Sequence, residues 1–267
     1  MAIKVEQENH HHGHDVGERL YLHRHSLVHS LPSHLKIIAA VAFIVVVVST
    51  PVTQWQAFIA YFVWLLSVVK IAKIPFLLLF KRALIEVPFI FFAILMPFFG
   101  SGEKIQVGPF DLYREGVIAG SGIVVKGTLG VMTAIILSTS TTAREILRGL
   151  ERLRLPALMV QIASFMLRYV NVVNDEMERM KIARESRGFE ATGMKSWKVL
   201  ATAAGALFIR SYERGERVHL SMLSRGYEGV LPQEHQHKIK GSIWFTAMIY
   251  PIVAALIFIA QLLIGRM

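Results

Sequence analysis

The stretch Ile37-Ile38-Ala39-Ala40-Val41-Ala42-Phe43-Ile44-Val45-Val46-Val47-Val48 contains no polar side chain and lies in an apolar run that starts near Leu35. Pro51 follows, and Trp55 opens a second run that ends near Val69. A bilayer core requires about 20 apolar residues as helix, so each run spans it only if its flanks contribute. The short, uncharged linker between the runs predicts a tight helical hairpin in a membrane.

Three further apolar runs cover residues 85–99, 116–137 and 243–264. Pro88 and Pro97 are expected to bend or end the first of them. The second is rich in glycine, which permits close helix packing in lipid. The sequence therefore predicts an all-α integral membrane protein with about five transmembrane helices plus long cytoplasmic amphipathic coupling helices. Four or six spans stay open, because the third and fourth runs are irregular.

The composition agrees with a membrane protein. Of 267 residues, 54% are hydrophobic and 18% charged, whereas a soluble domain carries roughly 25% charged residues. The absence of cysteine excludes disulfides, thiolate metal sites and cysteine nucleophiles. The net charge of +10 fits a basic cytoplasmic side better than a nucleic-acid partner. We expect no cleavable signal, since the N-terminal stretch mixes acids with histidines.

Charge asymmetry orients the spans. The connection that contains Lys70, Lys73, Lys81 and Arg82 is expected in the cytoplasm, and the mixed connection around residues 103–115 outside. More than half of the 29 Lys and Arg residues lie in residues 143–240, so that segment is also expected in the cytoplasm. The N-terminus is then inside and the C-terminus outside, in a multi-pass protein of a bacterial or archaeal cell (inner) membrane.

The predicted domains are a His-rich cytoplasmic tail (1–34), transmembrane helices 1–4 (35–138), a cytoplasmic coupling arm (139–241) and a C-terminal transmembrane helix (242–267). Lys126 falls near the middle of the fourth run, where a lysine is costly and usually faces a partner. It either snorkels from a tilted or broken helix or contributes to a substrate path. No cluster of membrane carboxylates accompanies it, which favours snorkelling.

Two long helices are predicted in the arm. Thr142-Ala143-Arg144-Glu145 fits a capping box that opens a short amphipathic helix, and Pro156 restarts the chain. A methionine-containing apolar stripe then predicts a helix that Gly188 ends, and its many charges favour a position on or beneath the membrane. A second helix is predicted from Ser196 or Trp197 to Gly226. The methionines fit either an interface that repacks or an irregular core.

A short phrase ends each of these helices: Ser186-Arg187-Gly188-Phe189-Glu190 and Ser224-Arg225-Gly226-Tyr227-Glu228. Glycine after a helix and arginine in its last turn explain one copy as ordinary capping. Repetition with a following aromatic residue and glutamate favours docking onto a partner that is present twice. The predicted docking residues are Ser186, Arg187, Gly188 and Phe189, and Ser224, Arg225, Gly226 and Tyr227.

Together with Leu155-Pro156, Arg168 and the run Ala183-Arg184-Glu185, these phrases resemble the T component of an energy-coupling factor (ECF) transporter, most of all its CbiQ type. The resemblance covers nearly the whole chain. In that family two Ala-Arg-Gly-like motifs dock into two ATP-hydrolysing subunits. Both copies here read Ser-Arg-Gly, a departure that keeps the arginine and the glycine.

The resemblance implies a non-catalytic subunit with no catalytic residue and no bound cofactor. Arg187 and Arg225 would each insert into one ATP-binding cassette ATPase. The membrane helices would hold a substrate-binding S component (CbiM-like), and a small accessory membrane subunit is a further partner that the resemblance allows. ATP and Mg²⁺ would bind the partner subunits, since the chain has no G-x-x-x-x-G-K-[ST] pattern. Co²⁺ would be the transported ion, with nickel or a vitamin as alternatives.

The histidines suggest a metal role less firmly. His10, His11, His12 and His14 precede Asp15, and neutral imidazole binds cobalt, nickel, copper and zinc. The tail is predicted in the cytoplasm, the wrong side for capture from outside, so a regulatory or storage role, or none, is favoured. Three other classes of protein are alternatives: a membrane enzyme, a self-contained secondary transporter and an ordinary ABC permease. The first two need ionisable groups converging in the spans, and the third offers one coupling element per subunit.

Overall fold

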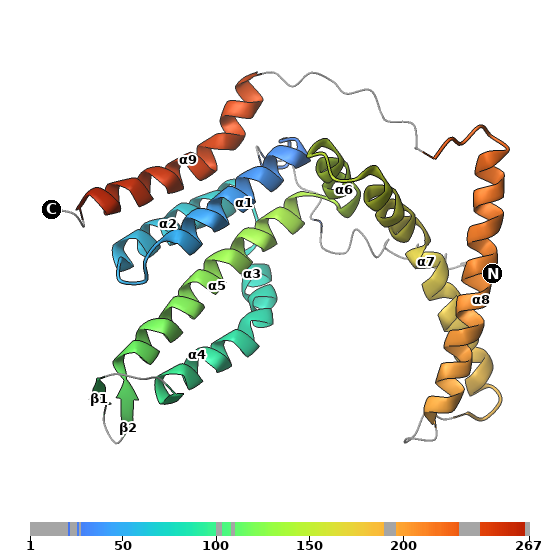
Figure 1. The fold of residues 1–267 in the computed structure, drawn as a ribbon, viewed down its shortest axis with the longest axis horizontal. Helices are drawn as coiled ribbons and strands as arrows, with labels where there is room; N and C mark the ends of the chain where they lie inside the picture. The colour runs from blue at the N-terminus through green and yellow to red at the C-terminus, as the bar shows by residue number, and fades with distance from the viewer. Residues whose placement is uncertain are drawn as a thin grey trace, which may run out of the picture. The chain divides into compact units, whose positions relative to one another are not determined.

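The structure is a computed structural model that describes residues 21, 26, 28–99, 103–107, 110–189, 196–229 and 241–264. The predicted all-α membrane class is confirmed, with one small hairpin added (Figure 1). The elements are α1 (Ser33–Ser49), α2 (Trp55–Ile71), α3 (Phe76–Ala83), η2 (Leu84–Glu86), α4 (Val87–Phe99), β1 (Lys104–Val107), β2 (Phe110–Tyr113), α5 (Arg114–Ser140), α6 (Ala143–Arg152), α7 (Ala157–Glu185), α8 (Ser196–Leu223) and α9 (Gly241–Ile264).

The chain forms two compact units. The first, which we call the bundle, comprises Leu20–Leu153 and His237–Met267 and includes α1–α6 and α9. The second contains Arg154–Gln236 with α7 and α8, and we call it the arm. The boundaries predicted from the sequence put α6 in the arm, and those boundaries stay a prediction.

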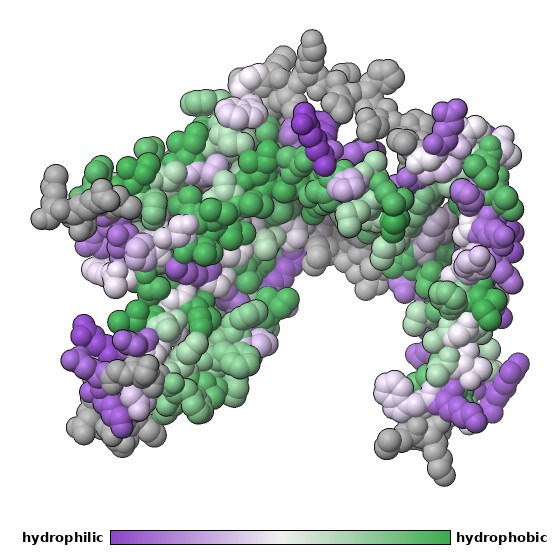
Figure 2. All heavy atoms as spheres, viewed as in Figure 1, coloured by the Kyte–Doolittle hydropathy of each residue, from purple (hydrophilic) through white to green (hydrophobic). Residues whose placement is uncertain are grey.

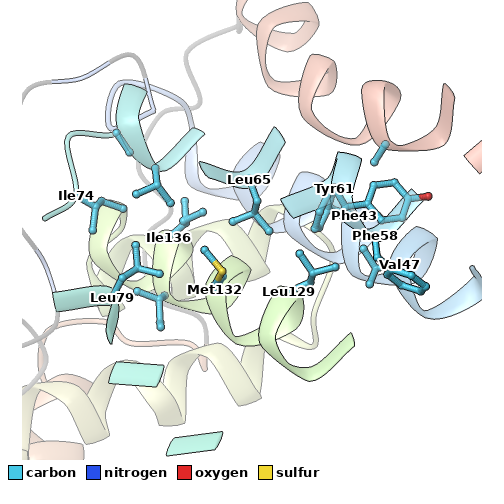
Figure 3. Packing of buried hydrophobic residues seen from close by; sticks show 14 of the residues in the cluster. Phe43, Val47, Phe58, Tyr61, Leu65, Ile74, Leu79, Leu129, Met132 and Ile136 are labelled. Carbon is cyan, nitrogen blue, oxygen red and sulfur yellow. The ribbon is translucent and has the colours of Figure 1, made fainter. Parts of the chain in front are cut away.

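One stripe of each bundle helix forms the core. Phe43 of α1, Tyr61 and Leu65 of α2, and Leu129 and Met132 of α5 are buried and lie close together (Figure 3). The outward faces are also apolar, for example Val41, Val45, Phe62 and Val63, each more than 40% exposed. Green, hydrophobic residues accordingly dominate the visible surface of these helices (Figure 2). Helices that are apolar on every side belong in lipid.

Among the residues that the structure describes, three helices are long and apolar enough to cross a membrane: α5, α7 and residues Trp244–Gln261 of α9. α1 and α2 are shorter apolar helices, and their 17 residues each extend about 26 Å, slightly less than the bilayer core. The inclusion of α7 differs from expectation. Its first half is apolar and its charges begin at Arg168, so its location outside the bilayer stays a prediction.

Two prolines lie in the third apolar run, residues 85–99: Pro88 is in the first turn of α4, just after η2, and Pro97 is inside α4 and does not end it. Pro88 has no N–H to donate to the carbonyl of Leu84, and Leu84 is the residue at which α3 gives way to the 3-10 turn η2. Pro97 lies inside α4 and leaves the carbonyl of Ala93 without its helical donor. The run therefore consists of the end of η2 and the single helix α4, in which Pro97 removes one backbone hydrogen bond.

The glycines of α5 allow α4 to pack directly against its backbone. A Cβ atom on Gly116 would lie 2.4 Å from the Met96 carbonyl oxygen, and one on Gly120 would lie 2.4 Å from the Ala93 carbonyl oxygen. Gly116 and Gly120 are four residues apart, so they lie on one face of the helix. The close helix packing expected from the glycine-rich fourth run is confirmed here.

A two-stranded antiparallel hairpin connects α4 to α5. β1 and β2 pair with Lys104 opposite Tyr113 and Val107 opposite Phe110. The Arg114 N–H also donates to the Glu103 carbonyl oxygen, over 3.0 Å, so the pairing continues to the start of α5. The charge pattern of this connection predicted only a loop outside the membrane, and the two strands were not predicted.

Two lysine side chains connect α5 to the two ends of α1. Lys126 of α5 donates to the Val48 carbonyl oxygen near the end of α1, with 2.7 Å between Nζ and O. Lys36 of α1 donates to the Ser140 carbonyl oxygen at the end of α5, over 2.8 Å. Each ammonium satisfies a carbonyl that has no intrahelical partner, at the negative end of the other helix dipole. We call these two contacts the reciprocal lysine caps.

The caps explain Lys126, and they predict the effect of removing it. Lys126→Met leaves the Val48 carbonyl at the end of α1 without this donor. We expect a loss of about 1–2 kcal/mol of stability, measured as a lower unfolding midpoint of the full chain in detergent. Lys70→Met, an exposed lysine in the last turn of α2, is the matched control. Equal midpoints for the two variants would exclude the capping role.

Candidate functional site

The predicted capping box at the start of α6 is confirmed. The Glu145 N–H donates to the Thr142 hydroxyl, and the Thr142 N–H donates to the Glu145 carboxylate, over 3.3 and 3.0 Å. Gly149 lets α6 lie directly on α1, since a Cβ there would be 2.9 Å from Ile37 Cδ1. The predicted restart at Pro156 is also confirmed, because α7 begins one residue later.

α7 and α8 form an antiparallel pair in the arm (Figure 1). Near the start of α7, the Gln161 side chain donates to the Tyr227 hydroxyl, just beyond the end of α8. Farther along α7, Glu176 forms an ion pair with Arg210, in the middle of α8. The 24 residues from Gln161 to Glu185 extend roughly 36 Å as helix. The two Ser-Arg-Gly phrases therefore lie at opposite ends of the pair.

The first phrase closes α7 with a two-bond glycine cap. Gly188 has a φ of +74°, a left-handed conformation that glycine adopts without strain. The Phe189 N–H donates to the Arg184 carbonyl oxygen over 3.1 Å, and the Gly188 N–H donates to that of Glu185 over 2.9 Å. This pattern is a Schellman motif. The Ser186 hydroxyl adds a bond to the Ala183 carbonyl oxygen.

The second phrase repeats this geometry bond for bond. Gly226 has a φ of +81°, and the Tyr227 N–H donates to the Met222 carbonyl oxygen over 3.0 Å. The Gly226 N–H donates to the Leu223 carbonyl oxygen, and the Ser224 hydroxyl to that of Ser221. Arg187 and Arg225 occupy the same position in the two motifs and are both exposed. The chain thus presents one arginine-bearing shape twice.

The aromatic residues make the two ends unequal. Tyr227 is held from two sides, by the Gln161 side chain and by the edge-on ring of His219, with 6.4 Å between centroids. Phe189 is half-buried, and no ring contact or hydrogen bond of its side chain is found among the described residues. The second end is therefore braced against α7, whereas the first is held by its own helix.

An apolar groove of about 830 Å³ runs between α7 and α8 and ends at Tyr227. Met166 and Met222 contribute to its walls. Met159, Met166 and Met177 are 61%, 67% and 53% exposed, so they do not fill a core within this chain. The methionines were interpreted either as an interface that repacks or as an irregular core, and the second interpretation is wrong for these three residues.

Metal binding was the other function predicted for particular residues. The predicted metal-binding residues His10, His11, His12 and His14 are outside the residues that the structure describes. Within the described part of the chain, no group of three or more His, Cys, Asp or Glu side chains is placed to hold a metal ion. The roles of Lys36 and Gln161 were not predicted from the sequence, and His219 was predicted as solvated surface, whereas that residue is exposed but also contacts the Tyr227 ring. Only the charge of Lys36 within an apolar run offered a signal for any of them.

The bundle and the arm define an integral membrane protein that presents two matched helix ends. The chain belongs to the CbiQ family of cobalt transport proteins, whose family model matches residues 24–239. It is a T component of the energy-coupling factor type.

Named relatives agree with this membership. The chain is 27% identical to the energy-coupling factor transporter transmembrane protein EcfT of Bacillus subtilis, over 89% of this chain and 93% of the relative. It is 28% identical to a putative fused cobalt transport protein CbiMQ of Methanocorpusculum labreanum, over 76% of this chain and 35% of that relative. An uncharacterised protein of Methanocaldococcus jannaschii is 33% identical, but the match spans only half of each chain.

Proposed function

We propose that this chain couples two ATPase subunits to a substrate-binding S component in an ECF-type importer. The observation that carries the proposal is the duplicated helix end, in which the same bonds present Arg187 and Arg225 at opposite ends of the arm. Arginine's planar fork binds a carboxylate bidentately, which suits an acidic groove. Two helix ends with the same geometry, roughly 36 Å apart, require two receiving grooves, one on each ATPase.

The mechanism is mechanical. When ATP binding closes the two ATPases, the docked ends move with them, and α7 and α8 transmit the displacement because helices are stiff over this length. The S component, held by the membrane helices, then reorients and releases its cargo inside. The chain's own residues supply docking and transmission and no chemistry. The contact of Lys126 with Val48 supports this assignment over a secondary transporter, since the intramembrane lysine already stabilises a helix end.

Cobalt is the cargo that we propose. The family description names cobalt transport, and the fused relative carries the same cargo in its name. Nickel and vitamins are the alternatives, because in this family the S component selects the substrate. The test is ATP-dependent uptake of radioactive Co²⁺ by vesicles that contain the purified native complex. Saturable uptake that excess Ni²⁺ does not suppress supports cobalt, and uptake of a vitamin alone would refute it.

The glycine caps allow the docking shape to be tested apart from its charge. Gly226→Ala places a Cβ in a left-handed conformation, which costs about 1–2 kcal/mol. No atom lies within 4 Å of that Cβ, so the effect is on the backbone alone. We expect ATPase binding to weaken roughly 5–30-fold in a pull-down titration.

The matched control is Gly205→Ala in α8, where the added Cβ also meets no atom and alanine favours the helix. Its ATPase binding should equal that of the unmodified chain. If both alanine variants bind the ATPases normally, the Schellman geometry has no part in docking.

A further inference from the structure

A cavity of about 220 Å³ lies inside the bundle, bordered by α1, α2, α5 and α9. Most of its wall is apolar and includes Ala39, Ala40, Trp64, Val68 and Ile136. Ile71 and Ile249 also border it and are 49% and 40% exposed, so the cavity reaches the outer, lipid-facing surface. Apolar cavities hold water poorly, and hydrocarbon is the better occupant.

The charged residue in this wall is Lys36, a buried side chain with 8% exposure; the other polar residues there, Thr133, Ser140, Thr246 and Tyr250, are neutral. Its ammonium has three N–H donors. Two of them bind the carbonyl oxygens of Ser140 and His29, over 2.8 and 3.1 Å. Within the described chain no carboxylate comes within ion-pair distance of its Nζ. One N–H donor therefore remains open at the cavity, and the carboxylate that attracts this ammonium, that of Glu145, lies beyond ion-pair distance.

The position of Lys36 along α1 fixes its depth. It lies one residue before Ile37, which contacts α6 at Gly149. α6 is amphipathic and carries Arg144, Arg148 and Arg152, the pattern of a helix at a membrane–water interface. Lys36 therefore lies near the level at which lipid headgroups meet acyl chains, with the apolar part of the cavity beside it.

We propose that this cavity binds an acidic phospholipid. Its phosphate accepts the remaining N–H of Lys36, and one segment of an acyl chain enters between Ala40 and Trp64. The rest of the lipid lies on the exposed apolar surface beside Ile71 and Ile249. An acidic headgroup fits better than a zwitterionic one because it brings a net negative charge to a buried ammonium that has no ion pair within the described chain.

The test is native mass spectrometry of the full chain in detergent, titrated separately with phosphatidylglycerol, phosphatidylcholine and inorganic phosphate. We expect phosphatidylglycerol to bind at least tenfold more tightly than phosphatidylcholine, and free phosphate not to bind measurably. Lys36→Met should remove the preference for phosphatidylglycerol, and Lys36→Arg should retain it. Lys70→Met, an exposed lysine in the last turn of α2, should change nothing.

A second variant keeps the proposal testable if Lys36→Met fails to fold. Ala40→Leu fills the cavity without altering Lys36 and should weaken phosphatidylglycerol binding at least tenfold. Equal affinity for the two lipids would overturn the proposal. So would full phosphatidylglycerol affinity in Ala40→Leu, or binding of free phosphate as tightly as of the lipid, which would indicate a simple anion site.

Discussion

Replacing both Arg187 and Arg225 with alanine is expected to abolish copurification of the ATPase subunits with this chain. Truncating one partner of a buried, hydrogen-bonded charge pair costs about 2–5 kcal/mol, and in this variant both arginine contacts with the ATPases are lost together. The motifs themselves should persist, since their bonds come from backbone groups and from Ser186 and Ser224. Tagged chain is purified from cells that express all subunits, and ATPase recovery is measured by quantitative mass spectrometry.

The matched control replaces Arg179 and Arg217 with alanine, which removes the same charge from exposed positions on α7 and α8. This variant should recover the ATPases at the unmodified level. An intact complex from the Arg187/Arg225 double variant would show that docking occurs elsewhere. Each single variant should retain partial binding, and because Tyr227 braces the second end, the two single variants are not expected to be equal.

Gly120→Val is expected to separate α4 from α5 and to destabilise the bundle by about 3 kcal/mol, the upper part of the range for overpacking. The new Cβ would lie 2.4 Å from the Ala93 carbonyl oxygen. That obstacle is backbone, so a change of side-chain rotamer does not relieve it. The measurement is the unfolding midpoint of the full chain in detergent.

Gly130→Val is the control within the same helix. A Cβ at Gly130 meets no atom within 4 Å, while the helix propensity of valine is the same at both sites. The difference between the two variants therefore isolates packing against α4. Equal midpoints would mean that α4 and α5 do not approach each other through Gly120.

Two local patterns, the runs of apolar residues and the residues that cap helices, made most of the helices predictable from the sequence. Apolar runs identified α1, α2, α5 and α9 because a helix that crosses a bilayer needs a long stretch of mostly apolar residues. The capping box before α6 and the glycines after α7 and α8 are local signals, so they were readable from the residues alone. The two glycine caps have the same hydrogen bonds, including the one from the serine hydroxyl, because the same Ser-Arg-Gly sequence forms both of them.

Features that depend on distant contacts were not predictable. Lys126 appeared to be unusual within its own helix, and its partner, the Val48 carbonyl, is 78 residues earlier in the chain. The β1–β2 hairpin carries local signals, since Lys104–Val107 alternates polar and apolar residues and Gly108-Pro109 is a turn dipeptide, but strands of four residues are too short for these signals to identify them alone. The brace of Tyr227 on Gln161 requires the antiparallel packing of two helices, which no local pattern records.

The most direct test of the central claim is the subunit stoichiometry of the purified native complex, measured by native mass spectrometry. The duplicated docking end predicts two ATPase subunits for each copy of this chain. It also predicts that Arg187→Ala or Arg225→Ala alone yields complexes with one. A complex that holds a single ATPase per unmodified chain would contradict the account.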